Sequence, residues 1–368
     1  MLIYEYKMDA RKDQYNAIDK AIRIVQFIRN KCIRLWMDEY DVSQNDLQVY
    51  CSTLASQYDF AKNLNSQARQ TSADRAWSSI QRFYDNCLAK KPGKKGYPTF
   101  QHDNRSVEYK QTGWKLDPDG RHITFTDGCG IGRVRMIGSR DLESCPVPQI
   151  RRVRIVKRAD GYYVQFAVHA YREVEHVPTG RCVGIDMGLN AYYTDSEGNT
   201  VDNPRYLRKA EKRIKQLHRK HSKCAKKSKN RKKAQKKLAK AHLKVQRQRE
   251  DFARKQANTL IQSSDMIAYE KLSIRNMVKN HHLAKSISDA SWGKFLAWVN
   301  YYGGIHHIPV IAVAPNFTSQ DCSSCGARVK KSLSVRTHVC HGCGLVMDRD
   351  HNAAVNILDK GMMVLSGR

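Results

Sequence analysis

Four cysteines near the C-terminus stand in two closely spaced pairs. Cys322 and Cys325 form one C-x-x-C pair, and Cys340 and Cys343 form a second pair 14 residues later. A glycine directly after each pair eases the tight turn that lets two thiolates bind one ion. Four thiolates complete the closed tetrahedron of a structural zinc site, so we expect one Zn²⁺ here. Unrelated free cysteines are an alternative. A redox pair is another, although one C-x-x-C pair would suffice for it.

Three acidic residues occupy positions where an isolated carboxylate is locally awkward. Asp186 follows an apolar strand, Glu270 ends the apolar segment 266–269, and Asp350 lies at the start of a predicted helix. Each acid alone has an ordinary explanation. Asp186 and Glu270 could be turn residues at strand ends, and Asp350 could be a helix N-cap. Together, their hard oxygen ligands would select Mg²⁺ or Mn²⁺. Two such ions about 3.5–4 Å apart can activate water and stabilise the leaving oxygen in phosphodiester hydrolysis.

The chain carries a large excess of positive charge. Its 368 residues include 65 Lys and Arg against 35 Asp and Glu, a formal net charge of +30. Such an excess repels itself in a compact protein unless a polyanion neutralises it, and DNA, RNA and acidic membranes are the candidates. The sequence shows no amphipathic anchor and no run of about 18 apolar residues, which favours nucleic acid over a membrane.

Two thirds of this excess lies in one segment, residues 205–255. It holds 23 Lys and Arg against three acids, a net charge of +20. A solvated or disordered linker is the ordinary explanation for such a run. However, apolar residues recur at helical spacing, which predicts two basic helices with one face on the protein and the other toward phosphates. The candidate phosphate contacts are Lys226, Lys227, Lys232, Lys233, Lys236 and Lys237.

The remaining cysteines indicate a reducing environment. Seven are scattered without a disulfide framework, and we expect them to be small buried hydrophobic residues. They are Cys32, Cys51, Cys87, Cys129, Cys145, Cys182 and Cys224. The N-terminal residues 1–7 alternate like a strand and lack the features of a secretory signal, so we expect a cytoplasmic protein.

Hydrophobic periodicity predicts an α+β multidomain organisation. Helices are expected over residues 11–40, 43–56 and 60–87, which together form a helical module at 10–92. Alternating strands, including a hairpin at Asp160-Gly161, predict a barrel-like β module at 93–178, with residues 1–9 as its first strand. An α/β domain at 179–320 carries the basic insert 205–255. A zinc ribbon at 321–346 precedes the end of that domain at 347–368.

Several motifs in this order resemble TnpB, the nuclease family of bacterial insertion sequences that is related to type V CRISPR effectors. They are Gly184-Ile185-Asp186-Met187-Gly188, Tyr269-Glu270-Lys271-Leu272, the segment 286–293, and the cysteine pairs running into Asp348-Arg349-Asp350-His351-Asn352-Ala353-Ala354. The N-terminal half resembles the family more loosely, through residues 27–31 and 96–100. The resemblance implies an RNA-guided endonuclease that cuts double-stranded DNA beside a short target-adjacent motif, with a ribonuclease H-like (RuvC) nuclease domain.

The resemblance also implies roles for individual residues. Asp186, Glu270 and Asp350 take the catalytic positions, with Asp348 as the alternative to Asp350, and Arg349 could touch the scissile phosphate. The helical and β modules resemble recognition and wedge domains that bind guide RNA and the target-adjacent duplex. Arg69 and Gln70 are candidates for contacting that motif, with Tyr109, Lys110 and Gln111 as weaker ones. A transposase or resolvase that needs no guide, and a guided repressor that does not cleave, are the alternatives. The expected location is the bacterial or archaeal cytoplasm, at the nucleoid when DNA is bound.

Overall fold

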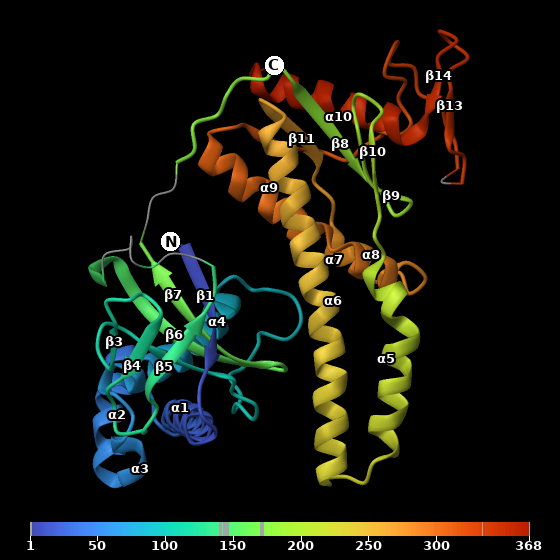
Figure 1. Ribbon diagram of the computed structural model, residues 1–368. Coiled ribbons are helices and arrows are strands. Elements are labelled where there is room, and N and C mark those ends of the chain that lie inside the picture. Colours follow the sequence, from blue (N-terminus) through green and yellow to red (C-terminus); the bar gives the residue numbers. More distant parts are fainter. Residues whose placement is uncertain (1, 140–141, 143–146, 170–172, 333, 368) are drawn as a thin grey trace. The chain divides into compact units, whose positions relative to one another are not determined.

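Figure 1 shows the computed structural model of the chain, which describes residues 2–139, 142, 147–169, 173–332 and 334–367. The chain divides into two compact units, residues 1–171 and 172–368. Within the described ranges, no helix is both long enough and apolar enough to cross a membrane.

The helices of the first unit are set by their apolar stripes and caps. They are α1 (Lys12–Asp38), α2 (Gln44–Gln57), α3 (Asp59–Lys62) and α4 (Ser66–Leu88). The Ser43 hydroxyl caps α2 by accepting from the backbone N–H of Asp46. The Asn65 side chain caps α4 by accepting from the N–H groups of Gln67 and Ala68. This cap divides the single helix that periodicity predicts over 60–87, because an Asx cap competes with continued helix.

The first unit also contains a seven-stranded sheet. Its strands are β1 (Leu2–Asp9), β2 (Ser106–Tyr109), β3 (Trp114–Leu116), β4 (His122–Phe125), β5 (Gly132–Ile137), β6 (Ile150–Arg158) and β7 (Gly161–Val168). Their order is β2-β6-β7-β1-β5-β4-β3. This order is open among the described residues, whereas the sequence predicts a barrel. The edge strands β2 and β3 are joined by residues 110–113, and the rings of Tyr109 and Phe125 lie 5.2 Å apart.

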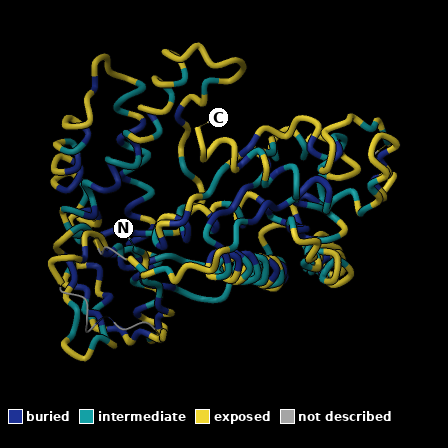
Figure 2. The backbone as a smooth tube through the Cα atoms, turned by 90° about the horizontal axis from the view of Figure 1, so that it is seen from above, coloured by how far each residue is buried: buried dark blue, intermediate teal, exposed yellow. Residues whose placement is uncertain are grey.

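Helices and sheet of the first unit share one hydrophobic core. Ile18 and Ile28 of α1 and Ile80 of α4 are buried with Val164 and Phe166 of β7 in a single cluster. In Figure 2 the buried stretches of the backbone are dark blue. The segments that the sequence treats as separate helical and β modules therefore fold around a common core.

The second unit is built on a five-stranded sheet. Its strands are β8 (Cys182–Met187), β9 (Ala191–Asp195), β10 (Thr200–Asp202), β11 (Met266–Glu270) and β12 (Val310–Val313), in the order β10-β9-β8-β11-β12. Strands β8, β11 and β12 are parallel, and β9 is antiparallel to both β8 and β10. The parallel strands therefore end at the same edge of the sheet.

Long helices cover both faces of this sheet. On one face, α6 (Lys229–Gln262) and α9 (Trp292–His306) pack against Val183, Ile185 and Ile267. On the other lies α10 (Arg349–Leu365), which extends well beyond the short helix expected over 352–358. Glycines permit its close approach: a Cβ at Gly184 would lie 2.2 Å from the Ala354 carbonyl oxygen, and one at Gly361 would lie 2.5 Å from Ala268 Cβ.

Shorter elements complete the second unit. Helix α5 (Tyr206–Lys223) pairs with α6, and α7 (Ile274–Met277) and α8 (Ala284–Ala290) lead into α9. Strands β13 (Thr337–Val339) and β14 (Val346–Asp348) form a separate antiparallel ribbon before α10.

The scattered cysteines are less uniformly buried than expected. Cys32, Cys51 and Cys129 are buried, whereas Cys182 and Cys224 are half-buried. Cys87 is exposed near the end of α4, so the expectation of a buried residue is wrong there. Cys145 lies outside the described residues.

Candidate active site, metal centre and nucleic-acid interface

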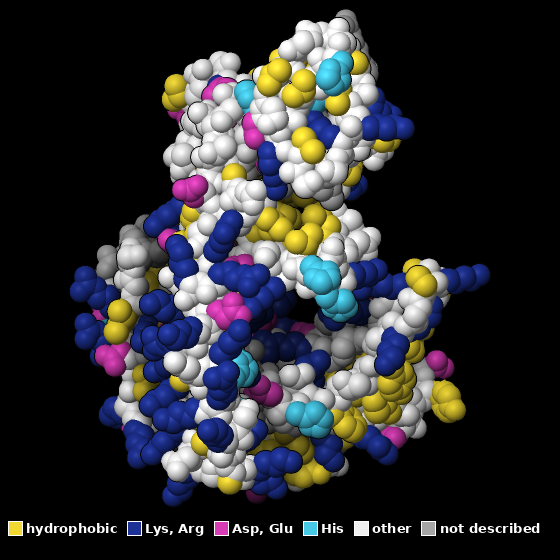
Figure 3. Space-filling view, turned by 90° about the vertical axis from the view of Figure 1, so that its right-hand side faces the viewer, with side chains coloured by type: hydrophobic (Ala, Val, Ile, Leu, Met, Phe, Trp, Pro, Cys, Tyr) yellow, Lys and Arg dark blue, Asp and Glu magenta, His cyan; other side chains and the backbone are white. Residues whose placement is uncertain are grey.

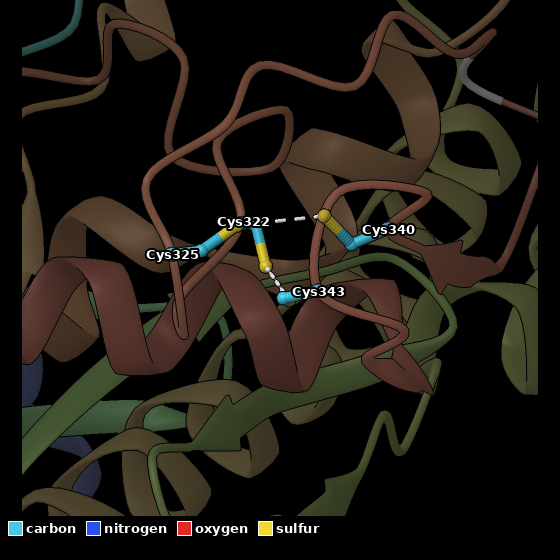
Figure 4. Close-up of side chains that lie close together, drawn as sticks. All are labelled: Cys322, Cys325, Cys340 and Cys343. Carbon is cyan, nitrogen blue, oxygen red and sulfur yellow. Dashed lines mark hydrogen bonds between the residues drawn. The ribbon is translucent and has the colours of Figure 1, made fainter.

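The four C-terminal cysteines converge on one point. Their sulfur atoms all lie within 4.8 Å of one another, and Figure 4 shows the side chains directed inward from two loops. The Sγ atoms of Cys322 and Cys343 are 3.6 Å apart, as are those of Cys325 and Cys340. A tetrahedron with Zn–S bonds of about 2.3 Å has S–S edges of about 3.8 Å, so this cluster fits a zinc ion.

Two matching turns bring the cysteines together. Gly326 and Gly344 both adopt positive φ, and their N–H groups donate to the carbonyls of Cys322 and Cys340, each at 2.9 Å. Backbone N–H groups of Cys343 and Gly342 lower the pKa of the Cys340 thiol to about 6. This favours the thiolate, which is the form that binds metal.

Asp186 and Glu270 are neighbours at the ends of two parallel strands. Ile185 of β8 is the register partner of Tyr269 of β11, so the next residues, Asp186 and Glu270, are adjacent as well. Because side chains alternate along a strand, both acids project from the face opposite to Ile185 and Tyr269. That is the face covered by α10, where Ala268 packs with Ile357.

Asp350 reaches the same edge through α10. The helix passes over Gly184 with Ala354 and Leu358, and over Ala268 with Gly361. The charge of Asp350 acts on Asp186, so the first turn of α10 lies near the end of β8. The three acids thus gather at one end of the sheet.

The acids influence one another electrostatically. Burial, followed by the charges of Glu270 and Asp350, raises the pKa of Asp186 well above its ordinary value. Burial also raises the pKa of Glu270, although a hydrogen bond from Thr318 and the charge of Lys360 oppose this. Full ionisation of the group is therefore unfavourable unless positive charge lies among the carboxylates.

The two C-terminal aspartates have different partners. Asp348 caps α10 by accepting from the N–H groups of Asp350, at 2.8 Å, and His351, at 3.1 Å. The N-cap role considered for Asp350 therefore belongs to Asp348. Asp350 instead accepts from Arg336 at 3.2 Å and Arg349 at 2.8 Å. Among the described residues, the carboxylate oxygens of Asp186, Glu270 and Asp350 do not all lie within 4.8 Å of one another.

Three polar residues that the sequence does not single out as site residues connect the acids to the cysteine cluster. The buried Thr318 hydroxyl donates to Glu270, and the Asn356 amide donates to the Thr318 carbonyl at 2.8 Å. The fully buried Asn352 donates to the Asp321 carbonyl at 2.8 Å and accepts from the Ser323 N–H at 3.1 Å. The segment 318–323 is thereby held on α10. Asn352 lies within the motif that ends in Asn352-Ala353-Ala354, which is a sequence signal for it.

The segment 205–255 forms the helical pair α5–α6, in place of a disordered linker. Ile214, Leu238 and Val245 form a small core between the helices. The six candidate lysines are all exposed, and Figure 3 shows Lys and Arg side chains crowded over the face to which α5 contributes. They are Lys226, Lys227, Lys232, Lys233, Lys236 and Lys237.

Asp289 holds the base of this helical pair. Its carboxylate accepts from the backbone N–H groups of Leu207, at 2.9 Å, and Arg208, at 3.2 Å, in the first turn of α5. It also accepts from Arg249 Nε of α6 at 2.9 Å. The side chain is buried, so the helix N-terminus and the guanidinium together offset its charge.

Neutralising four exposed lysines should test whether α5–α6 binds phosphates. We expect replacement of Lys226, Lys227, Lys232 and Lys233 by glutamine to weaken binding to DNA and RNA of every sequence. The slope of log affinity against log salt should become shallower by about 0.7–0.9 for each phosphate that the variant no longer neutralises. A fluorescence anisotropy titration over a range of salt concentrations measures both quantities. Glutamine at the exposed Lys12, Lys20, Lys62 and Lys90 is the charge-matched control; equal slopes would contradict the assignment.

The two candidate contacts to the target-adjacent motif, Arg69 and Gln70, lie in different environments. Arg69 donates to the carbonyls of Ala61, Lys62 and Leu64, so its guanidinium holds the loop before α4. Gln70 follows it and is half-buried.

The weaker candidates, Tyr109, Lys110 and Gln111, each make a contact within the first unit. Tyr109 is buried with its hydroxyl donating to Asp127 at 3.0 Å, which leaves it unavailable as a surface contact. Lys110 pairs with Asp74 at 3.0 Å. The backbone N–H of Gln111 donates to the side chain of Gln67 at 2.8 Å.

The second unit is thus a mixed α/β domain with an acidic edge and a four-cysteine ribbon. The sequence matches the family described as "Probable transposase" over residues 165–281, and the family described as "Cas12f1-like, TNB domain" over residues 292–357. These matches and the relatives described next show that the chain is similar to transposase-related and TnpB-like proteins.

Curated relatives are similar over different shares of the chain. A protein of Streptomyces pristinaespiralis, named as a candidate RNA-guided DNA endonuclease, is 37% identical over 186 residues, which cover 50% of this chain and 46% of that protein. The chain therefore spans less than half of the length of that relative. InsQ of Escherichia coli K12, also named as a candidate RNA-guided DNA endonuclease, is 26% identical over 330 residues, which cover 85% of this chain and 78% of InsQ.

Two solved structures share the fold. The protein in the Cas12f1–sgRNA–target DNA complex has a TM-score of 0.56 at 13% identity, covering 94% of this chain and 81% of that one. The mini-RNA-guided endonuclease CRISPR-Cas_phi3 has a TM-score of 0.57 at 10% identity, covering 100% of this chain and 93% of that one.

Proposed function

We propose that this protein is an RNA-guided endonuclease that hydrolyses phosphodiester bonds of double-stranded DNA next to a short target-adjacent motif, and that it belongs to an insertion sequence. The gathering of Asp186, Glu270 and Asp350 at one end of the second unit's sheet carries the nuclease part of the proposal. The names of the relatives support the guided part. The net charge of +30 supports nucleic-acid partners.

In this proposal the second unit is a ribonuclease H-like (RuvC) nuclease domain. Asp186, Glu270 and Asp350 would hold Mg²⁺ or Mn²⁺, since carboxylate oxygens suit such ions and their mutual repulsion calls for positive charge. Bound there, a pair of ions would supply an activated water and stabilise the leaving oxygen. Thr318 orients the Glu270 carboxylate by donating to it, and Asp348 orders the first turn of α10 that carries Asp350.

The other parts of the chain have supporting roles in the proposal. One structural Zn²⁺ on Cys322, Cys325, Cys340 and Cys343 would fix the ribbon beside the acids. The exposed lysines of α5–α6 would follow a nucleic-acid backbone without reading bases. The helices and sheet of the first unit would act as recognition and wedge modules for guide RNA and the target-adjacent duplex, with Gln70 as a contact and Arg69 supporting its loop.

The requirement for a guide tests the proposal as a whole. Purified protein with Mg²⁺ and a plasmid should be inert or non-specific once its RNA has been removed. Adding back the copurified RNA should produce one cut, and changing the variable end of that RNA should move the cut, because base pairing would carry the specificity. Gel mapping of cleavage sites measures the outcome.

The alternative to a guided nuclease is a transposase or resolvase, and the family description "Probable transposase" is consistent with it. It would share the same acids and differ only in needing no guide. Site-specific cleavage by protein stripped of all RNA would therefore refute guidance and favour this alternative.

A further inference from the structure

A polar cavity of about 600 Å³ lies in the first unit where α4 meets the strands β2 and β6. Four arginines line it: Arg75 and Arg82 of α4, and Arg152 and Arg154 of β6. We call this set the arginine cavity. It is separate from the three candidate catalytic acids and the four-cysteine cluster, all of which belong to the second unit.

One buried carboxylate organises three of these arginines. Glu108 of β2 is 2% exposed, and Arg154 is its register partner on β6. Its oxygens accept from Arg75 at 3.0 Å, Arg152 at 2.9 Å and Arg154 at 2.6 Å. One negative charge thus faces three positive charges, which is more than the neutralisation of a buried carboxylate requires.

These guanidinium groups retain unused capacity to donate hydrogen bonds. Each arginine offers about five N–H donors, of which Glu108 engages one or two. Arg75 also donates to the Ser106 hydroxyl at 3.2 Å. Arg152 and Arg154 keep 53% and 43% of their side-chain surface exposed. Donors from several guanidinium groups are therefore available at the arginine cavity for an acceptor with several oxygens.

The positive charges around this cavity also act on one another. Burial, followed by the charges of Arg75 and Arg82, lowers the pKa of Arg29 of α1. The Nε atom of Arg29 is buried, and among the described residues it has no hydrogen-bond partner. An anion in the cavity would relieve this repulsion.

Three carboxylates line the cavity with the four arginines, so they offset the positive charge only in part. Asp74 is paired with Lys110 at 3.0 Å and accepts from Gln48 at 2.7 Å. Asp85 is exposed and accepts from Gln81 at 2.9 Å. The carboxylate that touches the arginines directly is Glu108.

We propose that the arginine cavity binds phosphodiester groups of a nucleic-acid backbone. Arginine presents a planar fork of donors that matches phosphate oxygens two at a time, and a phosphodiester brings the negative charge that the cluster lacks. The site fixes the position of the backbone and does not read the bases. This inference rests on the nucleic-acid partners of the proposed function and assigns a binding site for them in the first unit.

The test uses the full chain with Arg82→Gln and Arg152→Gln combined. Both residues are exposed, and Glu108 keeps Arg75 and Arg154, so the fold should survive. Arg23→Gln with Arg151→Gln is the control, since both residues are exposed, lie outside the cavity and remove the same charge. Anisotropy titrations use two fluorescent probes, random-sequence duplex DNA and poly-uridine RNA. Thermal unfolding of each variant verifies the fold.

The cavity variant should bind at least one probe about tenfold more weakly than the control variant does, with a salt slope shallower by about 1 for each phosphate that it no longer neutralises. The probe that is affected identifies the source of the phosphodiester. Equal affinities and slopes of the folded cavity and control variants for both probes would overturn the inference, while the proposed function would stand. If the wild-type protein bound neither probe, the proposed function would fail as well.

Discussion

Replacing Asp186 by alanine should reduce guided cleavage of DNA by at least about a thousandfold. Metal-ion catalysis contributes several kcal/mol to transition-state stabilisation, and each 1.4 kcal/mol corresponds to about a factor of ten in rate. Glu270→Ala and Asp350→Ala should have similar effects, because all three carboxylates would hold the ions. DNA binding should stay within a few-fold of wild type, since Lys and Arg contact the phosphates. Plasmid cleavage and anisotropy binding assays on the same samples separate the two properties.

Two variants on α10 and at its N-cap serve as controls for these effects. Asp359→Ala removes an exposed acid from the same helix and should leave cleavage unchanged. Asp348→Ala removes the cap of α10, which should cost about 1 kcal/mol of stability and lower cleavage less than Asp350→Ala does, because it disturbs only the turn that carries Asp350. Cleavage by Asp350→Ala together with inactivity of Asp348→Ala would show that Asp348 is the metal ligand. Full activity of Asp186→Ala would refute the assignment of the nuclease site.

Removal of zinc should disorder the C-terminal ribbon. Elemental analysis should find about one zinc per chain. Structural zinc sites contribute about 10–16 kcal/mol of apparent binding free energy in small zinc domains, which is as large as the stability of a whole domain. Cys325→Ser should therefore lower the yield of folded protein and the zinc content together. Asn352 and Asn356 connect segment 318–323 to α10, which carries Asp350. Loss of zinc should therefore also lower DNA cleavage.

Cys87→Ser is the matched control for the zinc experiment. Cys87 is exposed, as Cys325 is, but it lies on α4 in the first unit. Its replacement should change neither the zinc content nor the yield. Metal-free wild-type protein in which all four C-terminal thiols react with a thiol reagent would contradict the zinc assignment.

Features that depend on short stretches of chain could be predicted from the sequence alone. The spacing of Cys322, Cys325, Cys340 and Cys343 defines two turns, and the observed cluster has the geometry that zinc requires. The apolar stripe of 205–255 predicts helices, and α5 and α6 are present. The apolar run before Glu270 predicts a strand that ends there, and β11 does so. In each case the information lies within a few turns of helix or a single strand.

Predictions from periodicity failed where a local cap or a tertiary contact competed with them. Periodicity predicts helix over 60–87, but the side chain of Asn65 caps α4 and interrupts it. The C-terminal helix continues to Leu365, beyond the stretch 352–358 that the sequence predicts, and Ile357 and Leu358 are the α10 residues that pack with Ala268 and Val313 of the sheet. Arg69 resembles a surface contact in sequence, yet its guanidinium is occupied by three carbonyls.

By itself, the sequence determined the local elements of this protein, its excess of positive charge and the types of residue available for chemistry. The tertiary structure decided which of them meet. Asp186, Glu270 and Asp350 are separated by about eighty residues at each step, and they converge because β8 and β11 are parallel neighbours and Gly184 lets α10 approach closely. The grouping of Arg75, Arg152 and Arg154 around Glu108 likewise joins α4, β6 and β2. Such contacts depend on how complete elements pack, and spacing along the chain does not encode that packing.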